Sequence, residues 1–131
     1  MVMTSELGHI ARHTGDINQA KKIYNETIKG WQDLGNRSAL AHQLECFAFI
    51  AKAQEQAERA ACLFGAAEAL REKINIAMTP QERIEYDHEI ADLRAGMDEH
   101  LFDSAWDEGR AMPMDEAIEN ASESNFGIPN S

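Results

Sequence analysis

Two pairs of side chains in this chain have types and spacings that could support chemistry, one of histidines and one of cysteines. His9 and His13 lie one helical turn apart, a spacing at which two imidazoles can hold zinc. In zinc-protease motifs a glutamate follows the first histidine, whereas here Ile10 follows it, and the sequence nominates no third ligand. We therefore expect two partly exposed surface histidines. A small histidine-based metal-binding sensor or enzyme is kept as an alternative hypothesis.

The cysteines, Cys46 and Cys62, fall on segments expected to form consecutive antiparallel helices, so a disulfide between them is geometrically conceivable. The start of the chain lacks the basic and then apolar layout of a secretory signal, which favours free thiols. Neither cysteine has a histidine at a spacing that indicates an activated nucleophile. We expect two free thiols.

Two short clusters place carboxylates beside histidines, as general acid–base sites do: Asp87-His88-Glu89 and Asp98-Glu99-His100. Adjacent residues of a helix point about 100° apart, so these groups do not converge on one substrate atom. Aromatic side chains at helical spacing are predicted to be core and not a stacking cage: Tyr24, Trp31, Phe64 and Trp106. The sequence thus predicts no catalytic residue, no cofactor, no metal site and no enzyme.

The elements that would position these side chains are helices, because two segments repeat one pattern. Ala60, Phe64 and Ala67 stand at i, i+4 and i+7, and 40 positions earlier the same stripe is formed by Ala20, Tyr24 and Thr27. The preceding segments match at the same offset, Leu7, Gly8 and Ala11 against Phe47, Ala48 and Ala51. This pattern of bulky and small residues is typical of closely packed antiparallel helices. It predicts an all-α fold of antiparallel helical hairpins of the tetratricopeptide type, an α–α superhelix.

Helix start and stop signals divide the chain into parts of one domain. Residues 1–75 are expected to form two hairpins, with helices at about 5–13, 17–33, 37–53 and 56–73. Residues 76–121 are expected to form an atypical helical cap packed on the hairpins, and residues 122–131 a disordered tail.

Within the helical cap over residues 76–121, the sequence predicts where two helices begin or end and which residues face the core. Thr79 and Glu82 form a capping-box pattern at the start of a helix over 80–95, and Gly109 is expected to end the next helix. Ile84, Ile90 and Leu93 are expected to face the core.

The charge is unevenly distributed. Residues 1–75 carry nine Lys/Arg and nine Asp/Glu, whereas residues 76–131 carry three Arg and fourteen Asp/Glu, which supplies the net charge of −11. Such an acidic half would repel a phosphate backbone, so direct nucleic-acid binding is not expected. It could dock a basic protein, and an acidic decoy of a basic protein is a further alternative. No apolar run approaches the roughly 20 residues of a membrane span, so a cytoplasmic protein is expected.

Three segments carry a resemblance to a known family: ERAACLFGAAEALRE, TPQERIEY and FDSAWDEGRAMPMDEAI. They resemble the C-terminal tetratricopeptide-like region of large bacterial regulators, the predicted ATPases of the STAND class that carry a LuxR-type DNA-binding or a cyclase domain. The resemblance covers roughly residues 7–120. The chain departs from the family at Gln54-Glu55, where a turn glycine is usual, and at Pro113, where Ser or Thr is usual. The resemblance implies a non-catalytic arm that senses or docks a protein partner.

In tetratricopeptide arrays the first helix of each hairpin lines a concave face. We therefore predict a groove for a protein or peptide partner, with Phe49 as its exposed aromatic, formed by His9, Arg12, His13, His42, Glu45, Phe49 and Lys52. Ser5, Glu6 and Cys46 fall on the same helix faces. Leu7, Ile10 and Ala11 have no preceding repeat to cover them, so self-association through the first helix is a possible second contact.

Overall fold

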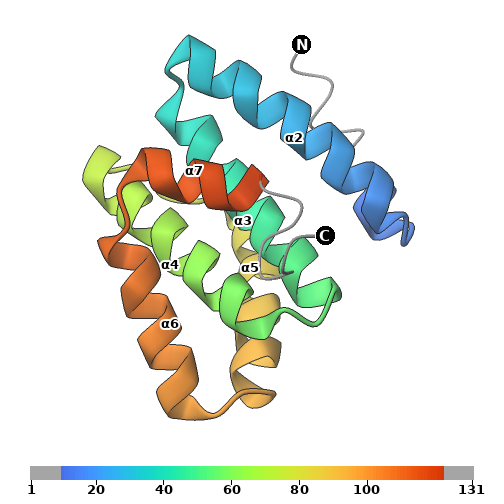
Figure 1. Cartoon of the computed structure of the whole chain (residues 1–131), viewed down its shortest axis with the longest axis vertical. Helices are drawn as coiled ribbons and strands as arrows, with labels where there is room; N and C mark the ends of the chain where they lie inside the picture. The colour runs from blue at the N-terminus through green and yellow to red at the C-terminus, as the bar shows by residue number, and fades with distance from the viewer. Residues whose placement is uncertain (1–9, 123–131) are drawn as a thin grey trace.

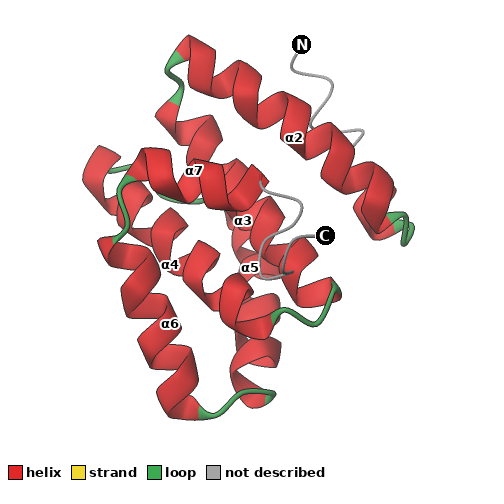
Figure 2. Ribbon diagram, viewed as in Figure 1, coloured by secondary structure: helices red, strands yellow, loops and turns green. Residues whose placement is uncertain are grey.

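The computed structural model describes residues 10–122, and all regular structure in that range is helical (Figures 1 and 2). A helical segment at 10–13 precedes six helices: α2 (Ile17–Leu34), α3 (Arg37–Ala53), α4 (Ala57–Ile74), α5 (Pro80–Ala95), α6 (Glu99–Ala111) and α7 (Met114–Ser122). The prediction of an all-α protein is confirmed. Within the described range, no helix has both the length and the apolar character needed to cross a membrane.

The helices begin where side chains satisfy their first free N–H groups. Asp16 accepts a hydrogen bond from the backbone N–H of Gln19, and Asp98 accepts one from that of Leu101. At α5 the capping box is complete, because the Thr79 hydroxyl accepts from the Glu82 N–H and the Glu82 carboxylate accepts from the Thr79 N–H. The predicted starts of the helices at 17–33 and 80–95 are confirmed.

The glycine expected to end the second helix of the helical cap has a different role. Gly109 does not end α6, which continues to Ala111, and the residue serves packing instead. A Cβ atom on Gly109 would collide with the backbone carbonyl of Cys62 on α4, and one on Gly65 would collide with that of Trp106 on α6. Glycine at both positions therefore lets the backbones of α4 and α6 touch.

The centre of the molecule is α3 with α4. The repeated stripes are buried on α2 and on α4, where Tyr24 and Phe64 are both fully inaccessible to solvent. In Figure 1, α7 crosses in front of α3 and α5 lies behind it. α6 is fixed to α4 by polar contacts as well, since the indole N–H of Trp106 donates to Glu68 at 2.8 Å and Arg110 donates to the same carboxylate at 2.7 Å.

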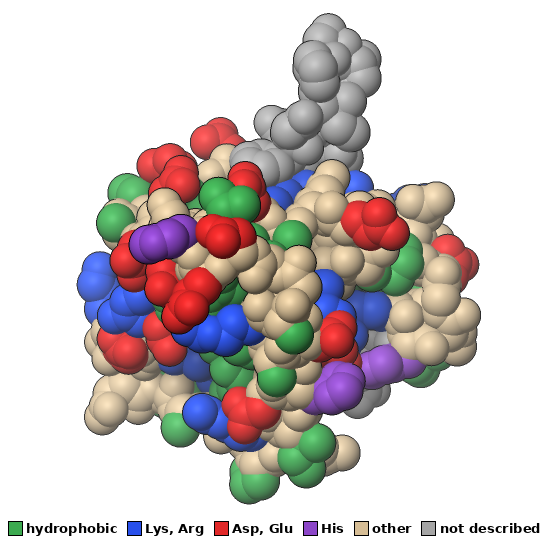
Figure 3. Space-filling view, turned by 90° about the horizontal axis from the view of Figure 1, so that it is seen from below, with side chains coloured by type: hydrophobic (Ala, Val, Ile, Leu, Met, Phe, Trp, Pro, Cys, Tyr) green, Lys and Arg blue, Asp and Glu red, His purple; other side chains and the backbone are tan. Residues whose placement is uncertain are grey.

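Acidic and basic side chains are interleaved on the face of the molecule seen in Figure 3, and hydrophobic side chains appear there in small separate areas. The prediction that Ile84 faces the core is wrong, because this residue of α5 is 73% exposed. The inner side of α5 instead holds Tyr86 and Leu93, which are buried, and Ile90, which is half-buried.

Candidate functional site

The groove predicted along α3 is occupied, because α5 lies against it. Arg12 and Lys52 form ion pairs with carboxylates of α5, and the imidazoles of His13 and His42 also lie against carboxylates of α5. Two further predicted groove residues, Glu45 and Phe49, are buried among these side chains. His9, Ser5 and Glu6 lie outside the described residues. The candidate site is therefore the face of α3 and the neighbouring 10–13 segment that α5 covers, here called the α3 face.

α5 meets the α3 face with a stripe of carboxylates. Glu82, Glu85, Glu89 and Asp92 are spaced by three, four and three residues, which places them along one side of a helix. The buried Tyr86 and Leu93 run alongside them. The inner face of α5 is half carboxylate, and apolar periodicity alone does not identify such a face. This is why Ile84 was wrongly predicted to face the core. Contacts within the protein also engage these four carboxylates, so they are not free for the basic partner of an acidic decoy.

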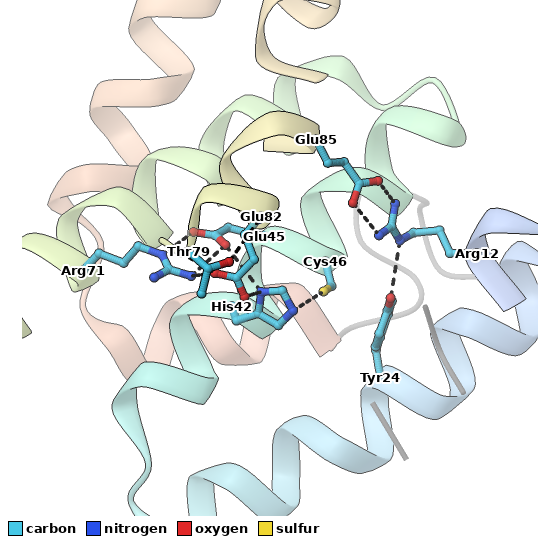
Figure 4. Close-up of polar contacts among 9 residues, drawn as sticks. All are labelled: Arg12, Tyr24, His42, Glu45, Cys46, Arg71, Thr79, Glu82 and Glu85. Atoms are coloured by element: carbon cyan, nitrogen blue, oxygen red, sulfur yellow. Dashed lines mark hydrogen bonds and ion pairs between the residues drawn. The ribbon is translucent and has the colours of Figure 1, made fainter. Parts of the chain in front are cut away.

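Arg12 makes the most extensive contact with α5 (Figure 4). Its Nη1 and Nη2 donate to the two carboxylate oxygens of Glu85 at 2.8 and 3.3 Å, and its Nε donates to the Tyr24 hydroxyl at 3.3 Å. The guanidinium also lies 4.5 Å from the ring centroid of Phe49. Burial opposes the charge of Arg12, but the hydrogen bonds to Glu85 and Tyr24 outweigh it and raise the pKa of the guanidinium. Arg12 is therefore a charged residue although its side chain is only 10% exposed.

Phe49 is the residue whose predicted role is wrong. It was expected to be an exposed aromatic in an open groove, yet only 7% of the residue is exposed. The guanidinium of Arg12 covers its ring on one side, and the ring packs edge-on against Phe64 at a centroid distance of 5.5 Å. Phe64 in turn contacts the ring of Tyr86 on α5 at 5.6 Å. Phe49 therefore belongs to the core beneath the α3 face.

At the other end of the stripe, Lys52 joins the last turn of α3 to two carboxylates of α5. Its Nζ lies 3.1 Å from Glu89 Oε1 and 2.7 Å from Asp92 Oδ2. The hydrogen bond from Lys52 lowers the pKa of Asp92. This pair and the Arg12–Glu85 pair hold α5 at two separated points on the face.

His42 and Cys46 form a thiol–imidazole contact on the same face. His42 Nε2 lies 3.7 Å from Cys46 Sγ, while His42 Nδ1 lies 3.4 Å from Glu82 and 3.7 Å from Glu45 (Figure 4). The electrostatic interaction with Cys46 raises the pKa of His42 well above its usual range against the effect of burial, and hydrogen bonds to Cys46 and Glu45 add to the shift. The expectation that no histidine lies near a cysteine at a useful spacing is wrong. The i, i+4 spacing of His42 and Cys46 was the signal that could have revealed this contact.

A buried ion pair supports the floor of the α3 face. Arg71 on α4 donates through Nε and Nη2 to the two carboxylate oxygens of Glu45 at 2.6 and 3.0 Å. Glu45 is 2% and Arg71 is 9% exposed. The Glu82 carboxylate lies 4.0 Å from Arg71, so the start of α5 is connected to α3 and α4 through one cluster.

The other residues considered for chemistry are dispersed. Cys46 and Cys62 are free thiols, and burial together with nearby carboxylates raises the pKa of Cys62 to about 11. His88 and His100 are exposed on α5 and α6. Among residues 10–122, no three His, Cys, Asp or Glu side chains are grouped as a metal site would require.

The arrangement as a whole is suited to holding a helix. Basic side chains of the α3 face are spaced to meet a carboxylate stripe, and the aromatic ring of Phe64 receives the ring of Tyr86 from the same helix. No protein-family model, no curated protein and no solved structure matches the chain.

Proposed function

We propose that this protein is a non-catalytic helical-repeat module that binds another protein through its α3 face. The observation that carries the proposal is that this face already holds a charged helix by oriented ion pairs at two separated points, through Arg12 and Lys52. A surface that fixes the position and the direction of one helix has the features needed to recognise another.

The tetratricopeptide-type arrangement belongs to the same proposal. Two equivalent stripes support it, since Ala20 and Tyr24 on α2 and Ala60 and Phe64 on α4 all have no exposed surface. Their identical burial at an offset of 40 residues is what two hairpins built to one plan would give. We further propose, from the resemblance to the bacterial regulators, that the module acts as a docking or sensing arm of a larger regulatory system.

A site-specific photo-cross-linker in the full chain tests this function. His13 is a suitable position, because its side chain is 58% exposed at the rim of the α3 face. The matched control position is Lys29, which is exposed on α2. We expect cross-linking at position 13 in cells to capture a distinct protein, and the additional substitution Arg12→Glu to abolish the product. Identical products from positions 13 and 29 would contradict the proposal.

A further inference from the structure

α5 is attached to the protein differently from its neighbour α6. Of its 16 residues only Tyr86 and Leu93 are buried. In α6, by contrast, Gly109 allows direct backbone contact with α4, and Phe102 and Ala105 are buried. α5 is therefore held chiefly by charged side chains, whereas α6 is held by close packing.

The charged contacts that hold α5 are partly open to water. The side chains of Glu85 and Glu89 are 34% and 23% exposed, and that of Asp92 is 62% exposed. Water competes for these carboxylates, so the pairs of Glu89 and Asp92 contribute little net stability, and the pair of Glu85 contributes more because Arg12 is largely shielded. Regions with few buried apolar contacts open before the rest of a protein unfolds. α5 is thus a segment that the remaining fold can release.

α5 also carries its own helix signals. Its capping box is formed within Thr79–Glu82, Pro80 occupies the first turn, and Gly96 follows its last residue. The connection before it begins at Asn75, which adopts the left-handed conformation with φ of 59°. Release of α5 from the α3 face would also part its side-chain contacts with α4 and α6, which are Tyr86 with Phe64, Glu82 with Arg71 and Arg94 with Phe102.

We propose, building on the function above, that α5 is an internal ligand of the α3 face and that the external partner is an acidic amphipathic helix of another protein that displaces it. Charge complementarity defines this partner. Arg12, His42 and Lys52 require carboxylates spaced by three, four and three residues, as α5 supplies them. The ring of Phe64 requires an aromatic residue directly after the second carboxylate, in the place of Tyr86.

A synthetic peptide with the sequence of residues 79–96 serves as the probe, with the full chain as its receptor. In the wild-type chain, covalently attached α5 competes at high effective concentration, so the peptide should bind weakly. The variant Glu85→Gln, Glu89→Gln, Asp92→Asn weakens internal α5 and keeps Glu82 for the capping box. The control variant Glu99→Gln, Asp107→Asn, Glu108→Gln makes the same change in charge on exposed residues of α6.

We expect the α5 variant to bind the peptide at least tenfold more tightly than the wild type or the α6 variant does. Adding Arg12→Ala should remove this gain. A peptide of the same composition with its carboxylates shifted by two positions should bind at least tenfold more weakly than the in-register peptide. Equal binding of the two peptides would overturn the assignment of the partner while leaving the α3 face as a protein-binding surface. Self-association of the α5 variant without peptide binding would identify a second copy of this chain as the occupant of the α3 face. That result would also overturn the assignment of the partner.

Alkylation of Cys46 by iodoacetamide gives a readout that does not depend on the peptide. Cys46 is fully buried on the α3 face, and Cys62→Ser removes the other thiol. If α5 is released in the variant, alkylation of Cys46 should accelerate at least tenfold, and bound peptide should restore protection. Unchanged protection of Cys46 together with unchanged peptide binding would overturn the internal-ligand inference. The cross-linking result at His13 would then decide the proposed function separately.

Discussion

Arg12 and Glu85 lie 73 residues apart in the sequence, and their side chains meet in two roughly parallel hydrogen bonds of 2.8 and 3.3 Å. The same guanidinium donates to Tyr24 on α2 and covers the ring of Phe49 on α3. One side chain therefore connects α5 to two other helices.

A double-mutant cycle between Arg12→Ala and Glu85→Ala should give a coupling free energy of about 1–2 kcal/mol, because the pair is bidentate and largely shielded by Arg12's surroundings. The control cycle is Arg83→Ala with Asp87→Ala, an i, i+4 pair within α5 whose side chains are both 61% exposed. Its coupling should be about 0.3–0.5 kcal/mol. Urea unfolding measures both. A coupling for Arg12–Glu85 no larger than the control would show that this contact does not hold α5.

Local signals predicted the helices of this protein well. The bounds expected for the helices at 17–33, 37–53 and 80–95 differ by at most one residue from α2, α3 and α5. The reason is that caps such as Asp16 and Thr79 act within a few residues of the backbone groups they satisfy. The repeat of bulky and small residues likewise identified Tyr24 and Phe64 as core.

The contact between α5 and the α3 face could not be predicted in the same way. The sequence identified Arg12, His42 and Lys52 as members of one surface, but not that this chain covers that surface itself. The partner stripe is made of carboxylates, which on a helix usually face solvent. Only the three-dimensional path of the chain between α4 and α5 brings Glu85 to Arg12. Gly109 was misassigned for a related reason, since a glycine that ends a helix and one that permits close packing look alike in sequence.

The buried pair of Glu45 and Arg71 leads to a second prediction. Arg71→Met should destabilise the protein by about 3 kcal/mol, because it leaves the Glu45 carboxylate buried without its bidentate partner. The additional substitution Glu45→Leu should recover most of this loss, since the pair is then replaced by apolar groups. Arg83→Met, at a residue whose side chain is 61% exposed, is the control and should change stability by less than about 0.5 kcal/mol. Failure of the double variant to recover would mean that Glu45 has a further essential partner.

The close approach of α4 and α6 gives a third prediction. Gly65→Ala and Gly109→Ala should each destabilise the protein by about 2 kcal/mol, because the added Cβ meets backbone atoms that cannot rotate away. This cost exceeds the gain of about 1 kcal/mol that alanine brings within a helix. Gly96→Ala is the matched control, since its Cβ would find only ordinary contacts at 3.7 and 3.8 Å and should change the melting temperature little. Equal effects at all three positions would contradict the packing described.

Acid should release α5 before it unfolds the core. Burial opposes the ionisation of Glu85, but the hydrogen bond and the charge of Arg12, with a smaller contribution from His13, outweigh it and lower the pKa of Glu85 below its ordinary value of 4.5. A carboxylate with a lowered pKa in the folded state contributes stability above the unfolded pKa, and this contribution is lost as pH falls through the folded value. Hydrogen exchange of α5 amides, compared at matched intrinsic exchange rates, should therefore show falling protection below about pH 4.5 while amides of α3 stay protected.

Glu85→Gln provides the decisive comparison, because glutamine keeps the shape of the side chain and cannot titrate. In this variant the protection of α5 should be lower than in the wild type at neutral pH and should change less between pH 4.5 and pH 3. Glu99→Gln, an exposed change of the same kind on α6, should leave the wild-type pH profile intact. If α5 and α3 lost protection together in the wild-type protein, α5 would be an integral part of the core and not a releasable helix on the α3 face.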